Sequence, residues 1–308
     1  MRAVWSLWTE PLARHLDAIW LSSRSCLLAL ALSVELARRH VLHTVLCTAT
    51  RGARILVDGI GLEFSEVYTD LDKLSGYDPA WWSLGKMVAY RLQQEPFVHL
   101  DSDVFLWSPL PSRCFDADIF AQNPEPFVVG EGAWYIPAHF EDVIRTARGG
   151  WLPEEWKWYR THYVDKQRAI CCGIFGGCNL DFIHWYGDLA RRIVDHPANA
   201  VVLSGLRFKA RHMAMVEQYL LEICLTYRNV YGASSGERPL HVEFLFEDPA
   251  DAHVRAAQAG YTHLIADAKL NPDACTRLAR RLAEGWPETY ERIEKYLADR
   301  GRENIFVL

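Results

Sequence analysis

Along the first third of the chain, short continuous apolar runs alternate with longer segments in which apolar positions recur at helical spacing. Four short apolar runs have the length and the β-branched or aromatic content of buried strands, at residues 3–7, 43–47, 64–68 and 97–100. The segments between them repeat apolar positions at helical spacing, at residues 19–40, 53–62 and 83–94, and residues 8–11 are expected to form a loop. The order β-α-β-α-β-α-β predicts an α/β fold with a mostly parallel sheet.

The same periods predict further elements in the less regular remainder of the chain. Strands are expected at residues 118–122, 126–129, 240–246 and 261–265. Helices are expected at residues 180–196, 213–226 and 271–300, the last with a break at Pro287. Because no repeat or flexible linker interrupts this pattern, we expect one domain made of residues 1–106, residues 107–270 and a C-terminal helical tail, 271–308.

Composition narrows the class of ligand. The 308 residues include 33 Lys plus Arg and 39 Asp plus Glu, for a formal net charge of -6, and no basic run. Phosphate contacts need clustered Lys and Arg, so nucleic acid is not an expected partner. An acidic chain that handles a phosphorylated substrate usually needs a cation between the two, which favours a bound metal.

Cysteine usage and the apolar profile predict a cytoplasmic protein. The eight cysteines are scattered without paired spacing, as expected of buried thiols in a reducing compartment. The most apolar stretch, residues 26–34, is far shorter than the roughly 20 residues of a membrane span, and the N-terminus does not resemble a signal peptide. We therefore expect no membrane span.

The strongest chemical signal is Asp101-Ser102-Asp103, directly after the run 97–100. Ligands of open α/β sheets bind beyond the carboxyl ends of the strands, which is where these residues lie. Positions i and i+2 of a strand share a face, so Asp101 and Asp103 are expected to aim at one point. Two carboxylates facing solvent suit Mg2+ or Mn2+. The alternative is a polar turn that ends a buried strand.

This stretch resembles the DXD signature of the GT-A (Rossmann-like) glycosyltransferases, which join a nucleotide-sugar-binding half to an acceptor-binding half around a mixed sheet flanked by helices. The resemblance assigns residues 1–106 to the first half and residues 107–270 to the second. It implies that Asp103 binds the metal directly, that Asp101 contacts metal and ribose, and that Ser102 lies at the donor. Trp8 and Thr9, after the first strand, would lie near the nucleotide base.

A second segment resembles the late His-Phe-x-Gly-x-x-Lys-Pro motif of the glycogenin-like transferases. His263 and Lys269 keep the six-residue separation, whereas Leu264, Ala266 and Leu270 replace the Phe, Gly and Pro. The resemblance implies that His263 is the third metal ligand and that Lys269 stabilises charge on the leaving diphosphate. A histidine beside apolar residues is otherwise a common core group.

Three further residues are assigned through the same family. The segment 84–91 resembles the helix before the DXD strand, where Lys86 would approach the donor; the alternative is a solvated helix lysine. Residues 172–177 resemble a glycine-containing segment beside the donor sugar, which implicates Gly173 and nearby Asn179, and the alternative is a tight turn.

Residues 215–220 resemble an Asp-Gln pair at the start of a helix that faces the donor sugar. Glu217 replaces the Asp, and would orient the acceptor hydroxyl or stabilise the sugar; the alternative is an exposed first-turn glutamate. The tryptophans at 151, 156 and 158 are candidates for an acceptor surface, since indole rings stack on sugars and also fill cores.

These features together predict a metal-dependent glycosyltransferase that uses Mn2+ or Mg2+ and a nucleotide-sugar, with a UDP-hexose as the family default. The acceptor, whether glycan, peptide, protein or small molecule, is left open. Likeness to the glycogenin group implies retention of configuration. A nucleotidyltransferase is one alternative, but its Gly-rich basic loop is absent after the first strand. A non-catalytic nucleotide-sugar-binding protein is the other, because fold alone does not prove catalysis.

Overall fold

A computed structural model describes residues 1–131, 134–206, 209–301 and 304–307. The chain forms two compact units, each assembled from separate segments. The first unit contains residues 1–79, 97–111 and 256–308, and the second contains residues 80–96 and 112–255. The C-terminal helices therefore belong with the N-terminal strands, and the helix that precedes residue 97 belongs with the middle of the chain.

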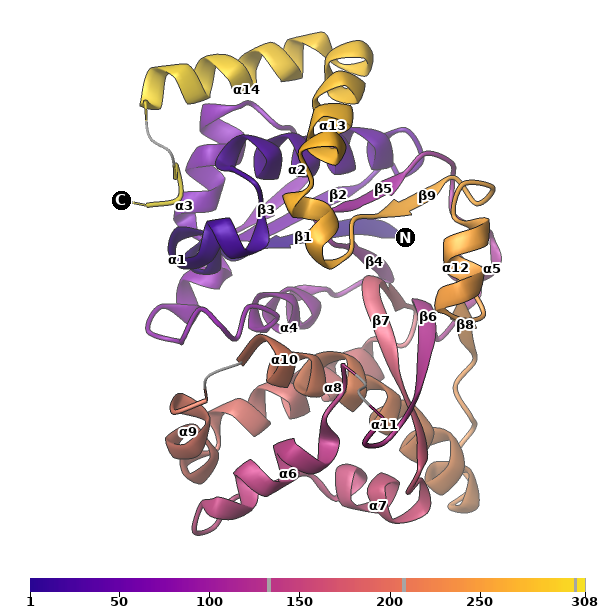
Figure 1. Ribbon diagram of the computed structural model, residues 1–308. Coiled ribbons are helices and arrows are strands. Elements are labelled where there is room, and N and C mark those ends of the chain that lie inside the picture. Colours follow the sequence, from indigo (N-terminus) through magenta and orange to yellow (C-terminus); the bar gives the residue numbers. More distant parts are fainter. Residues whose placement is uncertain (132–133, 207–208, 302–303, 308) are drawn as a thin grey trace. The chain divides into compact units, whose positions relative to one another are not determined.

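The first unit contains four parallel strands, in the order β3-β2-β1-β4. They are β1 (Arg2–Leu7), β2 (Thr44–Thr48), β3 (Glu66–Tyr68) and β4 (Phe97–Leu100). Each coincides with a predicted strand, and β2 and β4 are buried throughout, as parallel strands covered by helices should be. The predicted α/β class, with a mixed sheet flanked by helices and helices at the C-terminus, is confirmed (Figure 1).

The connection after β1 differs from the prediction of a loop at 8–11 and one helix at 19–40. Helix α1 (Thr9–Ile19) begins almost at once, and α2 (Ser23–Arg38) follows. Pro11 is compatible with this start because a proline in the first helical turn forfeits no intrahelical hydrogen bond. Ser22 is the N-cap of α2 and ends the short segment between the two helices, because its side chain accepts a hydrogen bond from the Ser25 backbone N–H.

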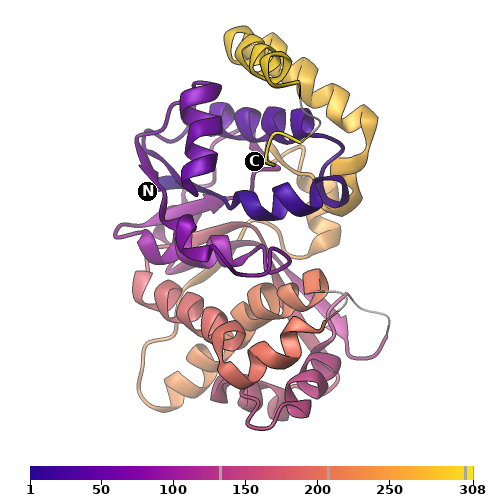
Figure 2. The same cartoon turned by 90° about the vertical axis from the view of Figure 1, so that its left-hand side faces the viewer.

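The remaining helical segments of the first unit are short near the sheet and long at the C-terminus. They are α3 (Thr50–Ala53), the π-helical η1 (Arg54–Gly59), the 3-10 segments η2 (Asp70–Leu74) and η5 (Ala266–Leu270), α13 (Pro272–Gly285) and α14 (Pro287–Arg300). The break at Pro287 is as predicted. Helices α13 and α14 both pack against α2, which is buried over most of its length (Figures 1 and 2). Residues 302–303 and 308 of the predicted tail lie outside the described part.

A small antiparallel pair completes the first unit: β5 (Val104–Leu106) pairs with β9 (Tyr261–His263). More than 150 residues of sequence separate the two strands. Their pairing brings the segment after Asp103 beside the segment before Lys269, and β5 also packs on α2. This pair is the element that assembles the candidate site described below.

In the second unit β6 (Ile119–Val128) lies between β7 (Lys166–Gly177) and β8 (Val242–Phe244), antiparallel to the first and parallel to the second. The sequence predicted two strands at 118–122 and 126–129, but they form one strand with an irregularity between Ala121 and Asn123. The tight turn offered as an alternative for residues 172–177 is wrong, because these residues lie within β7.

Helices make up the rest of the second unit. They are α4 (Leu84–Leu92), α5 (Arg113–Asp116), α6 (Pro137–Thr146), α7 (Glu154–His162), α8 (Leu180–Asp195), α9 (Pro197–Ser204), α10 (Lys209–Ala214), the π-helical η3 (Met215–Tyr219), α11 (Leu220–Thr226), the π-helical η4 (Tyr227–Gly232) and α12 (Pro249–Arg255). Helix α4 packs along α8, as the amphipathic pattern of both segments leads one to expect.

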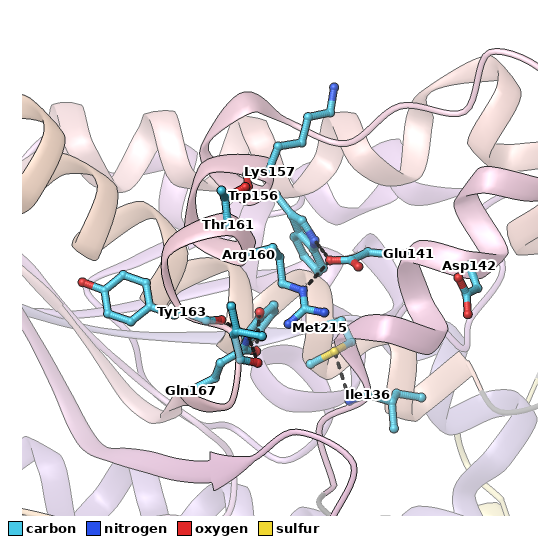
Figure 3. A network of polar contacts seen from close by, with 12 residues as sticks. Ile136, Glu141, Asp142, Trp156, Lys157, Arg160, Thr161, Tyr163, Gln167 and Met215 are labelled. Atoms are coloured by element: carbon cyan, nitrogen blue, oxygen red, sulfur yellow. Dashed lines mark hydrogen bonds and ion pairs between the residues drawn. The ribbon is translucent and has the colours of Figure 1, made fainter.

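The tryptophan-rich segment is largely a structural element. Trp156 is 1% exposed, and its indole N–H donates to Glu141 Oε1 at 2.8 Å. Arg160 Nε binds the same oxygen at 2.7 Å, so one carboxylate fixes α7 to α6 (Figure 3). The expectation that Trp156 belongs to an acceptor surface is therefore wrong: it is a core residue whose polar atom is satisfied.

No single helix in the described parts of the chain is long and apolar enough to cross a membrane. Only α1 and α2 taken together pass such a test, and they are bent by 112° relative to each other.

Candidate metal centre

Asp101 and Asp103 lie in a tight turn between β4 and β5. The Val104 backbone N–H donates to the Asp101 carbonyl at 3.0 Å and closes the turn. Both carboxylates were predicted to lie on one face of a strand, and that local geometry is wrong. The two side chains nevertheless approach each other because the backbone reverses between them.

His263 reaches the same point through strand pairing. In the β5–β9 pair Val104 lies opposite His263, and the Leu264 backbone N–H donates to the Asp103 carbonyl at 3.0 Å. His263 Nε2 is 3.6 Å from Asp103 Oδ1. One potential ligand atom from each of Asp101, Asp103 and His263 lies within 4.8 Å of the others. The structure thus brings together the three residues that the sequence assigned to a metal.

Lys269 joins this cluster from η5. Its ammonium Nζ is 2.7 Å from Asp103 Oδ2 and 5.8 Å from the centre of the Trp20 ring. The Leu21 backbone N–H donates to the Lys269 carbonyl at 3.2 Å, which holds the turn against the segment between α1 and α2. Asp103 therefore has one oxygen toward His263 and the other toward Lys269.

The backbone between His263 and Lys269 has an unusual conformation at Ala266. Its φ is +50°, and among the described residues it is the only non-glycine residue with a positive φ. The left-handed region costs an L-residue roughly 1–2 kcal/mol, so glycine is its usual occupant. Ala266 is the position where the resembling motif has glycine.

His99 and Ser6, neither of which was predicted to have a role, support the cluster. His99 is 1% exposed; its Nδ1 is 3.7 Å from Asp101 Oδ1, and its Nε2 hydrogen-bonds to Ser6 Oγ at 2.9 Å. Neighbours of this kind orient a ligating carboxylate. The signal was available, because His99 is two residues before Asp101 and so lies on the same side of an extended chain.

Cys26 is buried near the Asp103–Lys269 pair. Burial raises the pKa of its thiol to about 12, an effect that the Lys269 charge partly opposes and the Asp103 charge reinforces. Among the described residues, the ligand atoms that converge belong to Asp101, Asp103 and His263, and Cys26 is not one of them. The donor set therefore consists of two carboxylates and one imidazole.

This donor set fits a hard or borderline divalent cation. Two carboxylates and one imidazole suit Mn2+, and Mg2+ also binds through one or two carboxylates. The side chains of Asp101 and Lys269 are 19% and 22% exposed, whereas that of Asp103 is 5% exposed. Asp103 is thus held rigidly beneath a partly open site, where phosphate oxygens or water can complete the coordination.

Lys86 and Glu217 form a buried ion pair in the second unit. Lys86 Nζ is 2.8 Å from Glu217 Oε1, with side-chain exposures of 7% and 0%, and lies 5.1 Å from the Trp82 ring centre. Neither the solvated lysine nor the exposed first-turn glutamate offered as alternatives is correct. Glu217 lies in the π-helical η3. Its backbone carbonyl accepts a hydrogen bond from Tyr186 Oη at 2.8 Å. Such π-helical turns are frequent at functional sites.

The other residues assigned to donor binding lie in several places. Ser102 is half-buried in the Asp101–Asp103 turn, and Trp8 and Thr9 are buried where β1 passes into α1. Gly173 is buried within β7 of the second unit. Asn179 is the N-cap of α8, where its Oδ1 accepts from the Phe182 backbone N–H at 3.0 Å, so that oxygen already has a structural role.

The chain belongs to a family of unknown function, DUF6734, whose model matches residues 1–296. A comparison with curated proteins finds no match. The match includes Asp101, Asp103, His263 and Lys269, so the whole candidate metal centre lies within the part of the chain that defines the family.

Proposed function

We propose that this protein is a metal-dependent glycosyltransferase that transfers a sugar from a nucleotide-sugar, with a UDP-hexose as the expected donor, to a separate acceptor. The observation that carries the proposal is the convergence of Asp101, Asp103 and His263 within 4.8 Å, with Lys269 on Asp103. Two of these residues come from one end of the parallel strands and two from a segment 160 or more residues later, in the order that the resemblance to GT-A transferases requires.

The residues present fit the cation that such an enzyme needs. Asp101, Asp103 and His263 would hold Mn2+ or Mg2+, which when bound neutralises diphosphate charge and improves the leaving group. Lys269 adds a fixed positive charge beside Asp103, where it can stabilise charge that develops on the departing diphosphate. His99 keeps Asp101 oriented from behind, and Ser102 offers a hydroxyl beside the ribose.

Lys86 and Glu217, which the resemblance assigns to the donor and to the acceptor or sugar, form a sealed pair within the second unit, and we do not place them at the metal centre. The 2.8 Å contact holds the Lys86 ammonium in place, and the complete burial of Glu217 makes it a residue that positions Lys86 rather than one that meets the acceptor. The left-handed Ala266 adds support for the resemblance, because the backbone keeps a glycine-like conformation although the residue is alanine.

The chain leaves β1 in a way that favours a sugar transferase over a nucleotidyltransferase. Only Trp8 separates β1 from α1, so there is no Gly-rich basic loop at this point to hold a triphosphate. The eight cysteines, all of which are described, are free thiols, and seven of them are buried. This state fits a reducing compartment and supports our assignment of the activity to the cytoplasm.

Calorimetric titration with UDP and UDP-glucose, with and without Mn2+, tests the proposal. We expect metal-dependent binding in the micromolar range, roughly -8 kcal/mol. Slow release of free glucose and UDP from UDP-glucose in water would separate an enzyme from a binding protein. Failure of UDP and every other nucleoside diphosphate to bind, with metal present, would overturn the proposal.

A further inference from the structure

Among the described residues of the second unit, open cavities lie on either side of η4, and two of them differ in what their polar groups do. The larger, about 540 Å3, is lined by α7, β7, α11 and η4 residues. Its Glu222 accepts from Arg168 at 2.6 Å and from Thr226 at 2.7 Å, and its Asn229 binds both backbone groups of Leu240. Glu222 Oε1 and Asn229 thus hold protein partners, whereas the buried Glu222 Oε2 has no hydrogen-bond partner among the described residues, so most but not all polar groups of this cavity are used within the protein.

The second cavity, about 510 Å3, lies between the first turns of α8, the segment η4 and the chain that follows it. Its volume is within the roughly 300–1,000 Å3 of small-molecule sites. The lining residues are aromatic or polar, with glycine as the exception; they are Asn179, Asp181, Phe182, Trp185, Tyr227, Arg228, Tyr231, Gly232, Ser235 and Glu237. All of them belong to the second unit, so the cavity is complete within it.

The aromatic wall of this cavity consists of Phe182, Trp185, Tyr227 and Tyr231, which pack against other rings, and all but Phe182 are partly exposed. Trp185 touches Phe182 edge-on, with ring centres 5.5 Å apart, and is only partly buried. Tyr227 and Tyr231 stack on each other at 4.7 Å, and Trp158 meets Tyr227 edge-on at 5.4 Å. Tyr231 is 46% exposed. Rings fixed in this way present a rigid surface at low entropic cost to a ligand.

Several polar groups of the cavity remain available. Within the described ranges the indole N–H of Trp185 has no hydrogen-bond partner, and the exposed carboxylate of Asp181 forms no ion pair. Asn179 uses Oδ1 to cap α8, which leaves its amide N–H groups to donate elsewhere. The cavity thus offers one strong acceptor and two donors beside an aromatic face.

The charge balance decides which ligand suits these groups. The lining contains one arginine, Arg228, against two carboxylates, Asp181 and Glu237, so it carries an excess of negative charge and no lysine. Phosphates, nucleotides and organic acids are disfavoured at such a surface. A neutral ring with hydroxyl groups on its edge and C–H bonds on its face satisfies Asp181, Asn179 and Trp185 together.

We propose that this cavity is a carbohydrate-binding subsite in which a neutral sugar ring stacks on Trp185 and gives a hydroxyl hydrogen bond to Asp181. The site does not depend on the transferase proposal, since no residue of the candidate metal centre lines it. It uses Asn179 for a sugar, in agreement with the chemistry expected of that residue.

Saturation-transfer NMR with the methyl glycosides of glucose, galactose, mannose and N-acetylglucosamine tests the subsite. At least one glycoside is expected to bind the wild-type protein. Trp185→Ala should weaken that binding roughly tenfold, the loss expected from one stacking contact with its hydrogen bond, and Trp185→Phe should restore most of it. Asp181→Asn should also weaken it roughly tenfold. Trp134→Ala, at a tryptophan 58% exposed outside the cavity, is the matched control and should bind as wild type.

Three results would overturn the subsite: no glycoside binds, Trp185→Ala binds as well as Trp134→Ala, or choline binds in preference to every sugar. The last result would make the aromatic wall a site for ammonium ions.

Calorimetry with UDP and Mn2+ on the same samples keeps the two proposals apart. Trp185→Ala should retain UDP binding, and Asp103→Asn should retain glycoside binding. Loss of glycoside binding in Asp103→Asn alone would place the sugar at the metal centre and contradict the subsite.

Discussion

The candidate metal centre and the Lys86–Glu217 pair both join charged residues that are far apart in sequence, but they differ in charge balance and access. The metal centre sets the carboxylates of Asp101 and Asp103 against the single ammonium of Lys269, and parts of it are about one-fifth exposed. The other region pairs one ammonium with one carboxylate, at 7% and 0% exposure.

The difference indicates separate roles for the two regions. A partly open cluster with excess negative charge gains from binding a cation, because the cation supplies the charge that the protein omits. A sealed, balanced pair gains nothing from a cation, and the desolvation of its charges is offset only while both partners remain. Metal chemistry is therefore expected in the first region and rigid positioning in the second.

The largest effect is expected from breaking the buried pair. Lys86→Met leaves the Glu217 carboxylate buried without its partner, which should lower the free energy of unfolding by about 3–5 kcal/mol. Urea denaturation measures the loss. Lys157→Met, at an exposed lysine of α7 in the same unit, is the matched control and should change stability little.

The double variant Lys86→Met, Glu217→Met sharpens the test, since removal of both charges should recover most of the lost stability. If Lys86→Met were as stable as Lys157→Met, the pair would not be the sealed element described here, and the contrast with the metal centre would disappear.

The next largest effect concerns the open cluster. Asp103→Asn keeps the shape of the side chain but removes its charge, and should weaken Mn2+-dependent UDP binding at least roughly a hundredfold, the upper end of what even outer-shell changes cost. Calorimetry with and without Mn2+ measures the change. The control is Asp267→Asn, an exposed carboxylate in η5 outside the cluster. If UDP binding depended on Mn2+ equally in Asp103→Asn and Asp267→Asn, the assignment of the metal centre would be wrong.

A smaller loss than for Asp103→Asn, roughly tenfold or more in Mn2+ affinity, is expected for His263→Ala, because the two carboxylates remain. Folding should be affected less than metal binding, since His263 contributes to the β5–β9 pair through its backbone. Thermal unfolding and metal titration on one sample compare the two effects, with His253→Ala as a surface control. A variant that melts early yet binds Mn2+ normally would make His263 a structural residue instead.

Much of the fold could be predicted because the periods of the chain are clear. The four parallel strands follow from apolar runs, and the break in the C-terminal helices follows from Pro287. The loop predicted at 8–11 is wrong because α1 begins at Thr9 and includes Pro11, which is tolerated in a first helical turn. The two strands predicted at 118–122 and 126–129 are one strand, β6, which continues through Pro124 and Pro126.

In the candidate metal centre, only the residues that belong to a recognisable sequence motif could be predicted. Asp103 and His263 were assigned through a resemblance, but their contact depends on the pairing of β5 with β9, which no local pattern encodes. The Lys86–Glu217 contact was likewise out of reach, since burial of a charged residue follows from tertiary packing. The cavity beside Trp185 comes from residues spread over α8 and η4, so it required the structure.

The smallest expected effect tests whether backbone conformation, rather than charge, shapes the open cluster. Ala266→Gly should raise stability by about 0.5–1 kcal/mol, because relief of the left-handed alanine outweighs the extra chain entropy of glycine. This corresponds to roughly 1–3 °C in the unfolding temperature. Ala268→Gly, two residues later in η5 and without a positive φ, should instead lower it. Mn2+ affinity should stay unchanged in Ala266→Gly, since the turn from His263 to Lys269 keeps its conformation. A drop in stability equal to that of Ala268→Gly would show that the turn is not strained, and that the conformation shared with the resembling motif has no energetic basis.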